Sequence, residues 1–345
     1  MLVMRTVREH DLDQLIELVK CAGAGMTTLK ADRKLLAERI ANACDSFAER
    51  IPPERRDYVF VMEDVANGRL AGVSAIKSAV GLDEPFYNYR IGTLVHSSEE
   101  LGVYSQMDTL YLSNDLTGNS ELCSLFLHPD YRSGNNGKLL SKCRLLFIAQ
   151  FPHVFPQKLI AEMRGWQRED GSSPFWESLG RHFFKMGFSR ADDLSTLGRK
   201  SFIAELMPRY PLYIALLPEE ARQAIGCVHD DTAPARRMLE QEGMHYEGYV
   251  DIFDAGPVLQ SRITELRALR DSFLVAVDAG AETASTGMPA LVCNTAMTDF
   301  RAIVAPNCPL QGKIALTAVQ RQLLACSEGD TVRSMPINPQ EMAHV

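Results

Sequence analysis

The pattern of apolar and polar positions in the first eighty residues predicts two helices and three strands. Apolar residues recur at helical spacing in two stretches, 12–20 and 32–49, and the second stretch ends before a pair of prolines. Three shorter stretches rich in apolar residues are expected to be strands: 2–7, 58–64 and 70–79. The Asn67-Gly68 dipeptide between the last two strands predicts a tight hairpin turn.

The middle of the chain continues to mix strands and helices. Strands are predicted over 90–96, 109–113, 121–127, 159–163, 202–206 and 248–253. Helices are predicted over 138–150, 174–186 and from Pro234 to Gly243, where the glycine can end the helix with a positive φ. The stretch 121–127 is nearly all apolar, so we expect that strand to be buried on both faces. Elements in this order indicate an α/β or α+β sheet with helical cover.

The composition changes near residue 285. Residues 278–288 are small and polar, which is typical of a linker. Short β-like stretches follow, at 290–293, 300–304, 313–317 and 331–335. We therefore expect a main region over 1–284, divisible into lobes of about 1–200 and 201–284, and a small β-rich module over 285–345.

Composition and charge restrict the class of protein. The 345 residues are 46% hydrophobic and 23% charged, which is an ordinary globular mixture. Acidic residues exceed basic ones by 44 to 36, so the broad positive field that non-specific nucleic-acid binding needs is absent. The chain has no signal-peptide pattern, no long apolar run, no C-x-x-C and no H-E-x-x-H. We expect a cytoplasmic protein with no metal site and no membrane or nucleic-acid partner.

The stretch 121–144 carries the strongest chemical signal. It reads ELCSLFLHPDYRSGNNGKLLSKCR, a buried strand followed by a turn and an amphipathic helix. No acidic residue occurs between 131 and 144, but four basic ones do: Arg132, Lys138, Lys142 and Arg144. In an acidic chain this pattern predicts a local electropositive pocket.

The turn suits a diphosphate group. Four consecutive residues can adopt tight-turn or left-handed geometry that aims successive N–H groups in one direction: Gly134, Asn135, Asn136 and Gly137. The following helix adds its unpaired N–H groups and the positive end of its dipole. Arg132 and Lys138 supply compensating charge. The alternative is a plain strand–turn–helix unit with a solvated basic face.

These residues resemble the acyl-CoA loop of GNAT-type N-acyltransferases, whose pattern is [QR]-x-x-G-x-[GA]. Arg132 and Gly137 match the ends of the pattern, while Asn135 stands where the inner glycine belongs. Ala235, Leu239 and Gly243 also fit the A-x₃-L-x₃-G spacing of the closing helix of that fold.

A longer resemblance covers almost the whole chain. The chain is similar to the arginine N-succinyltransferase family, and within it to the beta-subunit type. The residues that carry it include EPFYNYRIGTLVHSSEELGVY (84–104), LSNDLTGNSELCSLFLHPDYRSGNNGKLLSK (112–142), SPFWESLGRHFFKMGFSRAD (173–192) and YVDIFDAGP (249–257). The resemblance implies an α+β, GNAT-like mixed sheet with flanking helices and a C-terminal β-rich module.

The resemblance also implies a reaction. Such enzymes transfer the succinyl group of succinyl-CoA to the α-amine of L-arginine, giving N2-succinyl-L-arginine and CoA in the first step of an arginine-degrading pathway. L-Ornithine presents the same α-amine and stays open as an acceptor. Succinyl-CoA is then a co-substrate rather than a permanently bound cofactor, and the chain is expected to form an oligomer with itself or with a homologous alpha chain.

The family further implies a succinyl-CoA contact at Leu125 and a proton donor at His229. The Leu125 side chain is expected in the core, so its role would belong to the main chain. Histidine suits proton transfer because its charge changes near neutral pH. Runner-up bases are His96 and His182. Together with Leu125, the coenzyme contacts expected on the strand and loop are Leu127, Arg132, Gly134, Asn135, Asn136, Gly137 and Lys138.

Other charged residues are weaker candidates. Arg90 and Arg164 could bind the succinyl carboxylate, and three acids could bind the guanidinium: Glu162, Asp251 and Asp254. Glu121 opens the buried strand, at a place where some GNAT enzymes carry a base. A different class of function also stays open, since the chain could be an acyl-CoA-binding subunit that does not catalyse.

Overall fold

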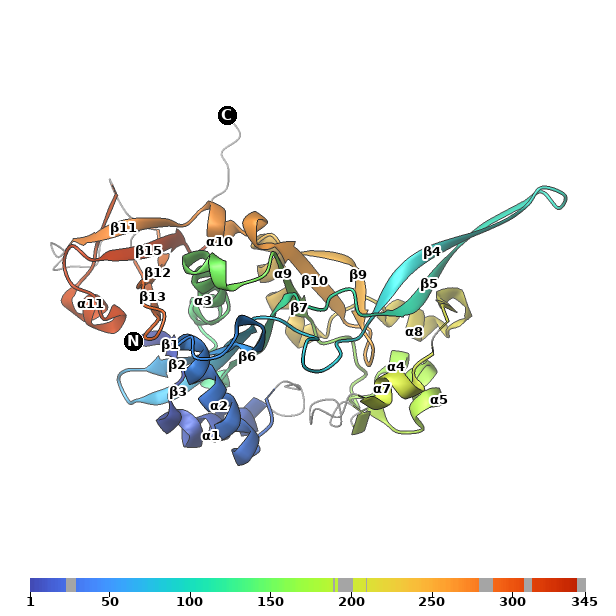
Figure 1. The fold of residues 1–345 in the computed structure, drawn as a ribbon, viewed down its shortest axis with the longest axis horizontal. Coiled ribbons are helices and arrows are strands. Elements are labelled where there is room, and N and C mark those ends of the chain that lie inside the picture. The colour runs from blue at the N-terminus through green and yellow to red at the C-terminus, as the bar shows by residue number, and fades with distance from the viewer. Residues whose placement is uncertain are drawn as a thin grey trace.

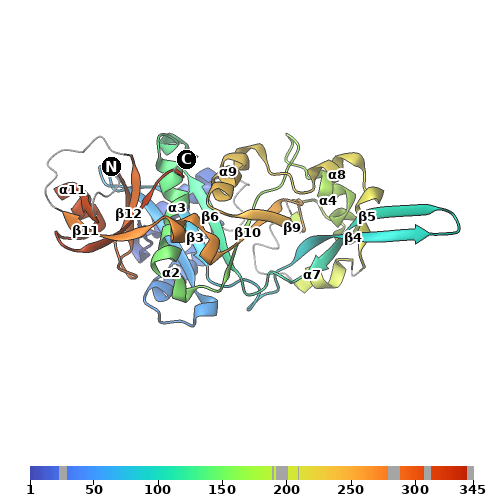
Figure 2. The same ribbon diagram turned by 90° about the horizontal axis from the view of Figure 1, so that it is seen from above.

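One mixed sheet of fifteen strands runs through the part of the chain that the structure describes. The computed structural model describes residues 1–22, 29–188, 190–191, 201–208, 210–278, 288–306 and 312–339. The strand order is β14-β11-β15-β12-β13-β1-β2-β3-β6-β7-β10-β9-β4-β5-β8. Helices lie on both faces of the sheet (Figures 1 and 2). The expected α+β architecture is therefore confirmed.

The strands are β1 (Leu2–Thr6), β2 (Asp57–Asp64), β3 (Arg69–Lys77), β4 (Asn88–Ser98), β5 (Val103–Ser113), β6 (Ser120–Leu127), β7 (Lys158–Glu162), β8 (Leu212–Tyr213), β9 (His245–Asp251), β10 (Pro257–Arg262), β11 (Phe273–Asp278), β12 (Ala290–Cys293), β13 (Arg301–Ala305), β14 (Lys313–Ala315) and β15 (Thr331–Pro336). The helices are α1 (Leu12–Ala22), α2 (Arg33–Phe47), α3 (Asn136–Gln150), α4 (Pro174–Ser178), α5 (Gly180–Phe184), α7 (Ser201–Leu206), α8 (Glu219–Ala224), α9 (Ala233–Gln241), α10 (Arg267–Arg270) and α11 (Ala318–Leu324). No described helix is long and apolar enough to cross a membrane.

Two hydrophobic cores lie on opposite faces of the central strands. Helices α1 and α2 cover one face, where Leu15 and Leu36 pack with side chains of β2 and β3. Helix α3 covers the other face, and its Phe147 lies at the centre of an aromatic cluster with ring centroids 5.0–5.8 Å from those of Phe47, Phe60 and Phe300. The helix is buried all round from Leu139 to Ala149, so the expectation of an amphipathic helix was wrong. The reason is that α3 is enclosed between the sheet and the C-terminal strands (Figure 1).

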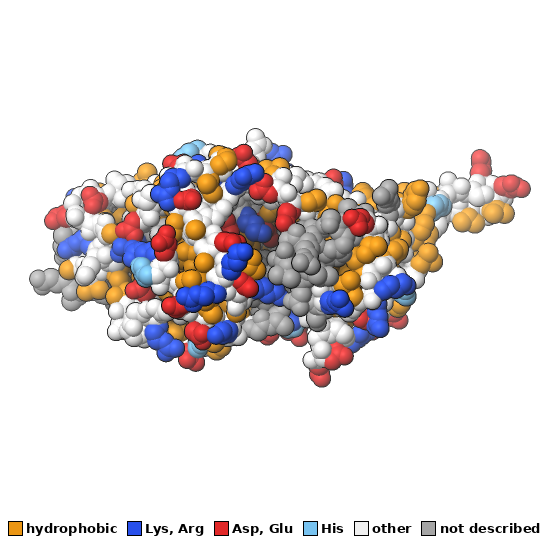
Figure 3. Space-filling view, turned by 60° about the horizontal axis from the view of Figure 1, so that its bottom comes forward, with side chains coloured by type: hydrophobic (Ala, Val, Ile, Leu, Met, Phe, Trp, Pro, Cys, Tyr) orange, Lys and Arg blue, Asp and Glu red, His pale blue; other side chains and the backbone are white. Residues whose placement is uncertain are grey.

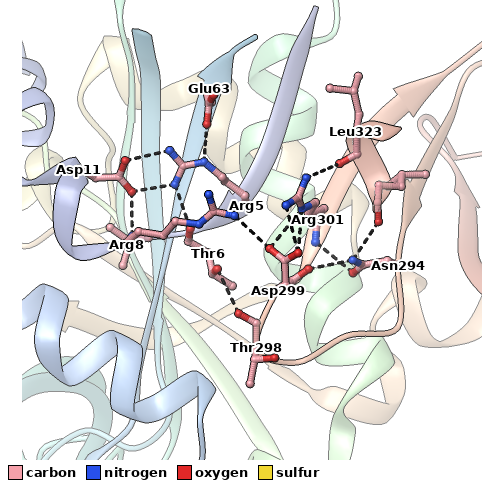
Figure 4. A network of polar contacts seen from close by, with 12 residues as sticks. Arg5, Thr6, Arg8, Asp11, Glu63, Asn294, Thr298, Asp299, Arg301 and Leu323 are labelled. Carbon is pink, nitrogen blue, oxygen red and sulfur yellow. Dashed lines mark hydrogen bonds and ion pairs between the residues drawn. The ribbon is translucent and has the colours of Figure 1, made fainter. Parts of the chain in front are cut away.

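The C-terminal strands join the main sheet through β13, which pairs with β1 at Met4↔Ala302 and Arg5↔Arg301. Side chains reinforce this seam (Figure 4): Arg8 donates to Asp299 at 3.2 Å, and Arg301 contacts the same carboxylate at 3.1 Å. Strand β11 precedes residue 285, yet it pairs with β14 and β15. The boundary between 284 and 285 stays a prediction, and most of the predicted linker, 279–287, lies outside the described residues.

Replacing Arg5 with methionine is expected to lower the free energy of unfolding by about 3–5 kcal/mol, because it leaves a buried carboxylate without its partner. Arg5 binds Asp11 through two N–H groups at 2.7 and 2.8 Å, and the Asp11 side chain is 1% exposed (Figure 4). Urea denaturation checks this. The control Arg33→Met removes an exposed ion pair with Asp13 and should cost less than about 1 kcal/mol. A cost for Arg5→Met as small as the control's would contradict the expectation.

Two predicted elements differ in the structure. Residues 202–206 form part of helix α7 rather than a strand. Ile203 and Met207 are both buried, and the Met207 N–H donates to the Ile203 carbonyl at 2.9 Å, so the apolar spacing here is i, i+4. The predicted helix 174–186 is two short helices, α4 and α5, separated at Leu179. The residue after the break, Gly180, packs directly on the Trp176 ring, and a Cβ at this position would lie 2.2 Å from the ring.

Strands β4 and β5 are longer than predicted and form a hairpin arm that projects from the body (Figures 1 and 2). The two strands pair from Asn88↔Ser113 to Ser98↔Val103. Apolar side chains are exposed towards the end of the arm: Leu94, Val95, Leu101, Val103 and Tyr104. Isolated two-stranded hairpins are marginally stable in water, so contact with another protein surface would stabilise such an arm.

Candidate active site

Strands β6 and β7 separate and create an opening in the middle of the sheet. They run parallel but share only two register pairs, Ser120↔Leu159 and Glu121↔Ile160. Beyond these pairs β6 stays with β3 as far as Leu127, whereas β7 stays with β10. Beyond these pairs, no strand among the described residues pairs with the two edges that face each other. An extended ligand can add to such an edge through main-chain hydrogen bonds.

Strand β6 carries a bulge at this opening. Its register with β3 passes from Ala75↔Cys123 to Val73↔Phe126, so Ser124 and Leu125 together face Ser74. Ser124 has a φ of 54°, in the left-handed region that favours glycine. The bulge turns Leu125 out of the core, and 37% of this residue is exposed. The expectation of a core side chain at Leu125 was therefore wrong.

Two arginines hold the bulge from opposite faces of the sheet. Arg39 of α2 donates to the Ser124 hydroxyl at 3.0 Å and pairs with Asp57 at 2.6 Å. Arg144 of α3 donates to the Cys123 carbonyl at 3.3 Å. The two arginines give hydrogen-bond partners to polar groups at the bulge, where the regular pairing with β3 is interrupted. They therefore stabilise an otherwise unfavourable backbone conformation.

The loop after β6 turns back to the end of that strand. Arg132 Nε donates to the Leu127 carbonyl at 3.1 Å, and its guanidinium lies over the Phe126 ring, 5.9 Å from the centroid. Gly134 has a φ of 55°, the only left-handed residue among the four predicted for the turn. Asn135 is the N-cap of α3 and makes no side-chain capping bond, and the first turn has no acidic residue. The helix start is thus suited to an external anion.

Only half of the predicted basic pocket faces the loop. Arg132 is exposed and Lys138 is half-buried, but Lys142 and Arg144 are 1% and 2% exposed. Lys142 binds the buried Glu242 carboxylate at 2.8 Å, and Arg144 binds the bulge described above. The expectation that all four form one pocket was wrong: Lys142 lies one turn beyond Lys138 on the same face of α3, where the C-terminal strands enclose it, and Arg144 faces the sheet at Cys123. Acidic and basic side chains intermingle on the face that Figure 3 shows.

His229 lies on a segment that extends the opening beyond the end of β7. Its N–H donates to the Arg164 carbonyl at 2.9 Å, and Gly165 forms an antiparallel bridge with Val228. Met163, the residue before Arg164, donates its N–H to the carbonyl of Pro257 at the start of β10. Successive residues of an extended chain direct their peptide groups to opposite edges, so His229 lies on the β6 side of this chain.

The imidazole of His229 is 21% exposed and is oriented by Asp231. Nδ1 lies 3.2 Å from the Asp231 nitrogen and can accept its N–H while Nδ1 carries no proton. When Nδ1 carries a proton, that proton can instead point to the Asp231 carboxylate, which lies 3.7 Å from Nδ1. The two runner-up bases lie elsewhere: His96 is on the arm, with Nε2 3.0 Å from the Tyr213 hydroxyl, and His182 is exposed on α5.

Two of the acids considered for binding the guanidinium, Asp251 and Asp254, accept backbone N–H groups instead. Asp254 accepts the N–H groups of Gly165 and Gly256 at 2.7 and 2.9 Å, and Asp251 accepts those of Phe253 and Asp254. Burial raises the pKa of the Asp254 carboxyl well above its usual value, and the nearby Asp251 charge adds to this. Both acids therefore brace the turn between β9 and β10.

Three further charged candidates are engaged with partners inside the protein. Arg90 pairs with Asp115 at 3.4 Å, and Asn88 donates to Glu162 at 2.7 Å. Glu121 is 3% exposed and lies 3.5 Å from the Lys77 ammonium. No group of three or more metal-ligating side chains occurs in the part of the chain that the structure describes.

Comparisons with known proteins agree over nearly the full length. The sequence profile of the arginine N-succinyltransferase beta subunit matches residues 2–268, and that of its C-terminal domain matches residues 274–336. Arginine N-succinyltransferase subunit beta of Pseudomonas aeruginosa is 50% identical over 342 residues, 99% of each chain. Arginine N-succinyltransferase of an Enterobacter species is 49% identical over 341 residues, again 99% of each.

A solved structure supports the same grouping. Arginine/ornithine succinyltransferase subunit AI from Pseudomonas aeruginosa matches this fold with a TM-score of 0.90 at 36% sequence identity, over 98% of this chain and 99% of that one. The similarity therefore includes the C-terminal strands as well as the opened sheet.

Proposed function

The chain belongs to the arginine N-succinyltransferase beta-subunit family, and we propose on this premise that the β6–β7 opening is where succinyl transfer takes place. The activity is that of an acyltransferase: the succinyl group of succinyl-CoA passes to the α-amine of L-arginine, giving N2-succinyl-L-arginine and CoA in the first step of the arginine succinyltransferase pathway. This placement is supported by the separation of β6 from β7 and by the start of α3 beside it, which has no side-chain cap and no acidic residue in its first turn.

The coenzyme is proposed to bind along β6 and the loop after it. The diphosphate lies against the N–H groups of Gly134, Asn135 and Gly137, with Arg132 and Lys138 beside it. The Asn136 N–H donates to the Ser133 carbonyl at 3.2 Å, so Asn136 contributes to the turn itself. The pantetheine arm continues along the open edge of β6, where Leu125 and Leu127 offer main-chain groups and apolar surface. Succinyl-CoA acts as a co-substrate, and no resident cofactor takes part, because a thioester is already activated towards an amine.

His229 is proposed as the proton donor. The neutral α-amine attacks the thioester carbonyl, the C–S bond breaks, and the new amide nitrogen loses the proton that the departing sulfur gains, so the atoms balance. The imidazolium donates this proton from Nε2 and recovers one from the amine. While Nε2 exchanges its proton, Nδ1 keeps its own and directs it at the Asp231 carboxylate, 3.7 Å away.

Thiol titration tests this function. The purified chain is incubated with succinyl-CoA and L-arginine, and free CoA is expected to appear in proportion to protein. Replacing L-arginine by L-ornithine, and succinyl-CoA by acetyl-CoA, measures the preference for each substrate. Thiol release only after a homologous alpha chain is added would favour the alternative of a non-catalytic, acyl-CoA-binding subunit.

The chain is further proposed to act in the cytoplasm, where CoA esters are made, as an oligomer with itself or with a homologous alpha chain. The β4–β5 arm, with its exposed apolar side chains, supports association, and a band of hydrophobic side chains continues from it onto the body (Figure 3). Light scattering is expected to give a mass of at least twice 38.4 kDa, alone or with the alpha chain. A monomer under both conditions would contradict this proposal.

A further inference from the structure

Three consecutive residues at the end of β15 receive three cationic side chains of the main region. Arg267 donates to the Pro336 carbonyl at 3.0 Å, and Lys142 donates to the Ile337 carbonyl at 2.7 Å. Lys138 donates to the Asn338 side-chain oxygen at 2.7 Å. The C-terminal strands thus end on the first turn of α3, next to the loop after β6.

The same strand contacts the other end of α3. Arg333 donates to the Gln150 side-chain oxygen at 2.9 Å. From residue 138 to residue 150 a helix rises by about 18 Å, and from 333 to 338 an extended chain spans about 17 Å. The two lengths agree, so β15 and the residues after it run antiparallel to α3 along nearly its whole length.

A buried ion cluster fixes this alignment. The Glu242 carboxylate is 0% exposed and lies 2.8 Å from both Lys142 and Arg267. Burial lowers the pKa of the Lys142 ammonium, while the charge of Glu242 acts in the opposite direction. A buried charge group tolerates few geometries, because any displacement leaves a desolvated ion without its partner. The Pro336 and Ile337 carbonyls are therefore held at defined positions against α3.

Lys138 differs from the other two cations because it belongs to the loop assigned to the diphosphate, and its partner Asn338 is exposed. A free lysine side chain samples many rotamers, and a fixed hydrogen-bond acceptor reduces that freedom. An amide oxygen restrains the ammonium without neutralising it, so the charge stays available to an anion. A carboxylate at position 338 would instead cancel the charge and repel phosphate.

We propose that Asn338 is a positioning residue for Lys138, through which the C-terminal strands prepare the coenzyme loop. The inference rests on the proposed function of the loop as a diphosphate site. It gives the C-terminal module a role in succinyl-CoA binding, carried by the alignment of β15 with α3.

The test compares Asn338→Asp and Asn338→Ala in the full chain, with the Kd for CoA measured by calorimetry at low ionic strength. Asn338→Asp should raise the Kd about tenfold and Asn338→Ala about two- to fivefold, magnitudes expected for a charge contact and a single hydrogen bond. The KM for succinyl-CoA should rise in parallel, while kcat and the KM for arginine stay within twofold. A purely structural role would leave the nearly isosteric Asn338→Asp close to wild type.

Gln322→Glu is the matched control, since it makes the same charge change on an exposed residue of α11 in the same module. It should leave the Kd for CoA unchanged. Lys138→Ala provides the second arm: in that background Asn338→Ala should have no further effect on the Kd for CoA, because Asn338 acts through Lys138. If Lys138→Ala weakens CoA binding but Asn338→Ala does not, the positioning role is wrong and the loop assignment stands. If Lys138→Ala also has no effect, the loop assignment itself fails.

Discussion

Replacing His229 with alanine is expected to lower kcat by about 10²–10⁴-fold, the usual contribution of a general acid or base, with little change in the Kd for CoA. The imidazole lies on the segment that faces the β6–β7 opening and can exchange a proton at Nε2. Removing it takes away the proton source for the departing sulfur but leaves the loop that is proposed to bind the diphosphate. Steady-state kinetics with calorimetry on the same preparation measure both quantities.

His128 provides a matched control for this substitution. It also precedes a short 3₁₀ turn, accepts the N–H of Asp130 on Nδ1 at 3.3 Å and is 22% exposed, so it has almost the same local contacts as His229. His128→Ala should therefore have a similar effect on stability and leave kcat within a few-fold of wild type. Equal kcat values for the two variants would refute the assignment of His229.

Replacing both Arg132 and Lys138 with alanine is expected to raise the Kd for CoA by about 10²-fold at low ionic strength, because each charge-assisted contact contributes about 1.5–3 kcal/mol and part of this is lost to exposure. The difference from wild type should shrink as salt is added, since both side chains are partly in solvent. Calorimetry across a salt series measures it.

The control for this double variant is Lys20→Ala with Arg33→Ala, which changes the net charge by the same amount. Both side chains are exposed and form surface ion pairs, with Glu17 and Asp13. These substitutions should leave the Kd for CoA unchanged at every salt concentration. A loop variant that binds CoA as tightly as this control does would show that the diphosphate is bound elsewhere.

Local patterns in the sequence were enough to predict the strand–turn–helix unit around residues 121–150, because the apolar strand, the turn residues and the helix are consecutive. The exposure of Leu125 could not be predicted in this way. It depends on a bulge in the register with β3, a strand about fifty residues earlier, and on arginines from α2 and α3. The pattern of apolar residues along a single strand does not indicate where a β-bulge occurs.

The basic pocket shows the same limit. Lys142 and Arg144 belong to the same charged run as Lys138, but the C-terminal strands enclose Lys142 and the main sheet buries Arg144. Their partners, Glu242 and the Cys123 carbonyl, are brought to them by tertiary packing. The segment that carries His229 is likewise placed next to the end of β7 by a bridge between Gly165 and Val228, 63 residues apart in the sequence. The family resemblance, rather than any local pattern, indicated that histidine.

A crystal structure of the full chain with CoA tests the central claim most directly. We expect the diphosphate within hydrogen-bond distance of N–H groups in the turn from Gly134 to Lys138, with the pantetheine arm entering the opening between β6 and β7. CoA bound at another surface, with the turn at Gly134 unoccupied, would contradict it.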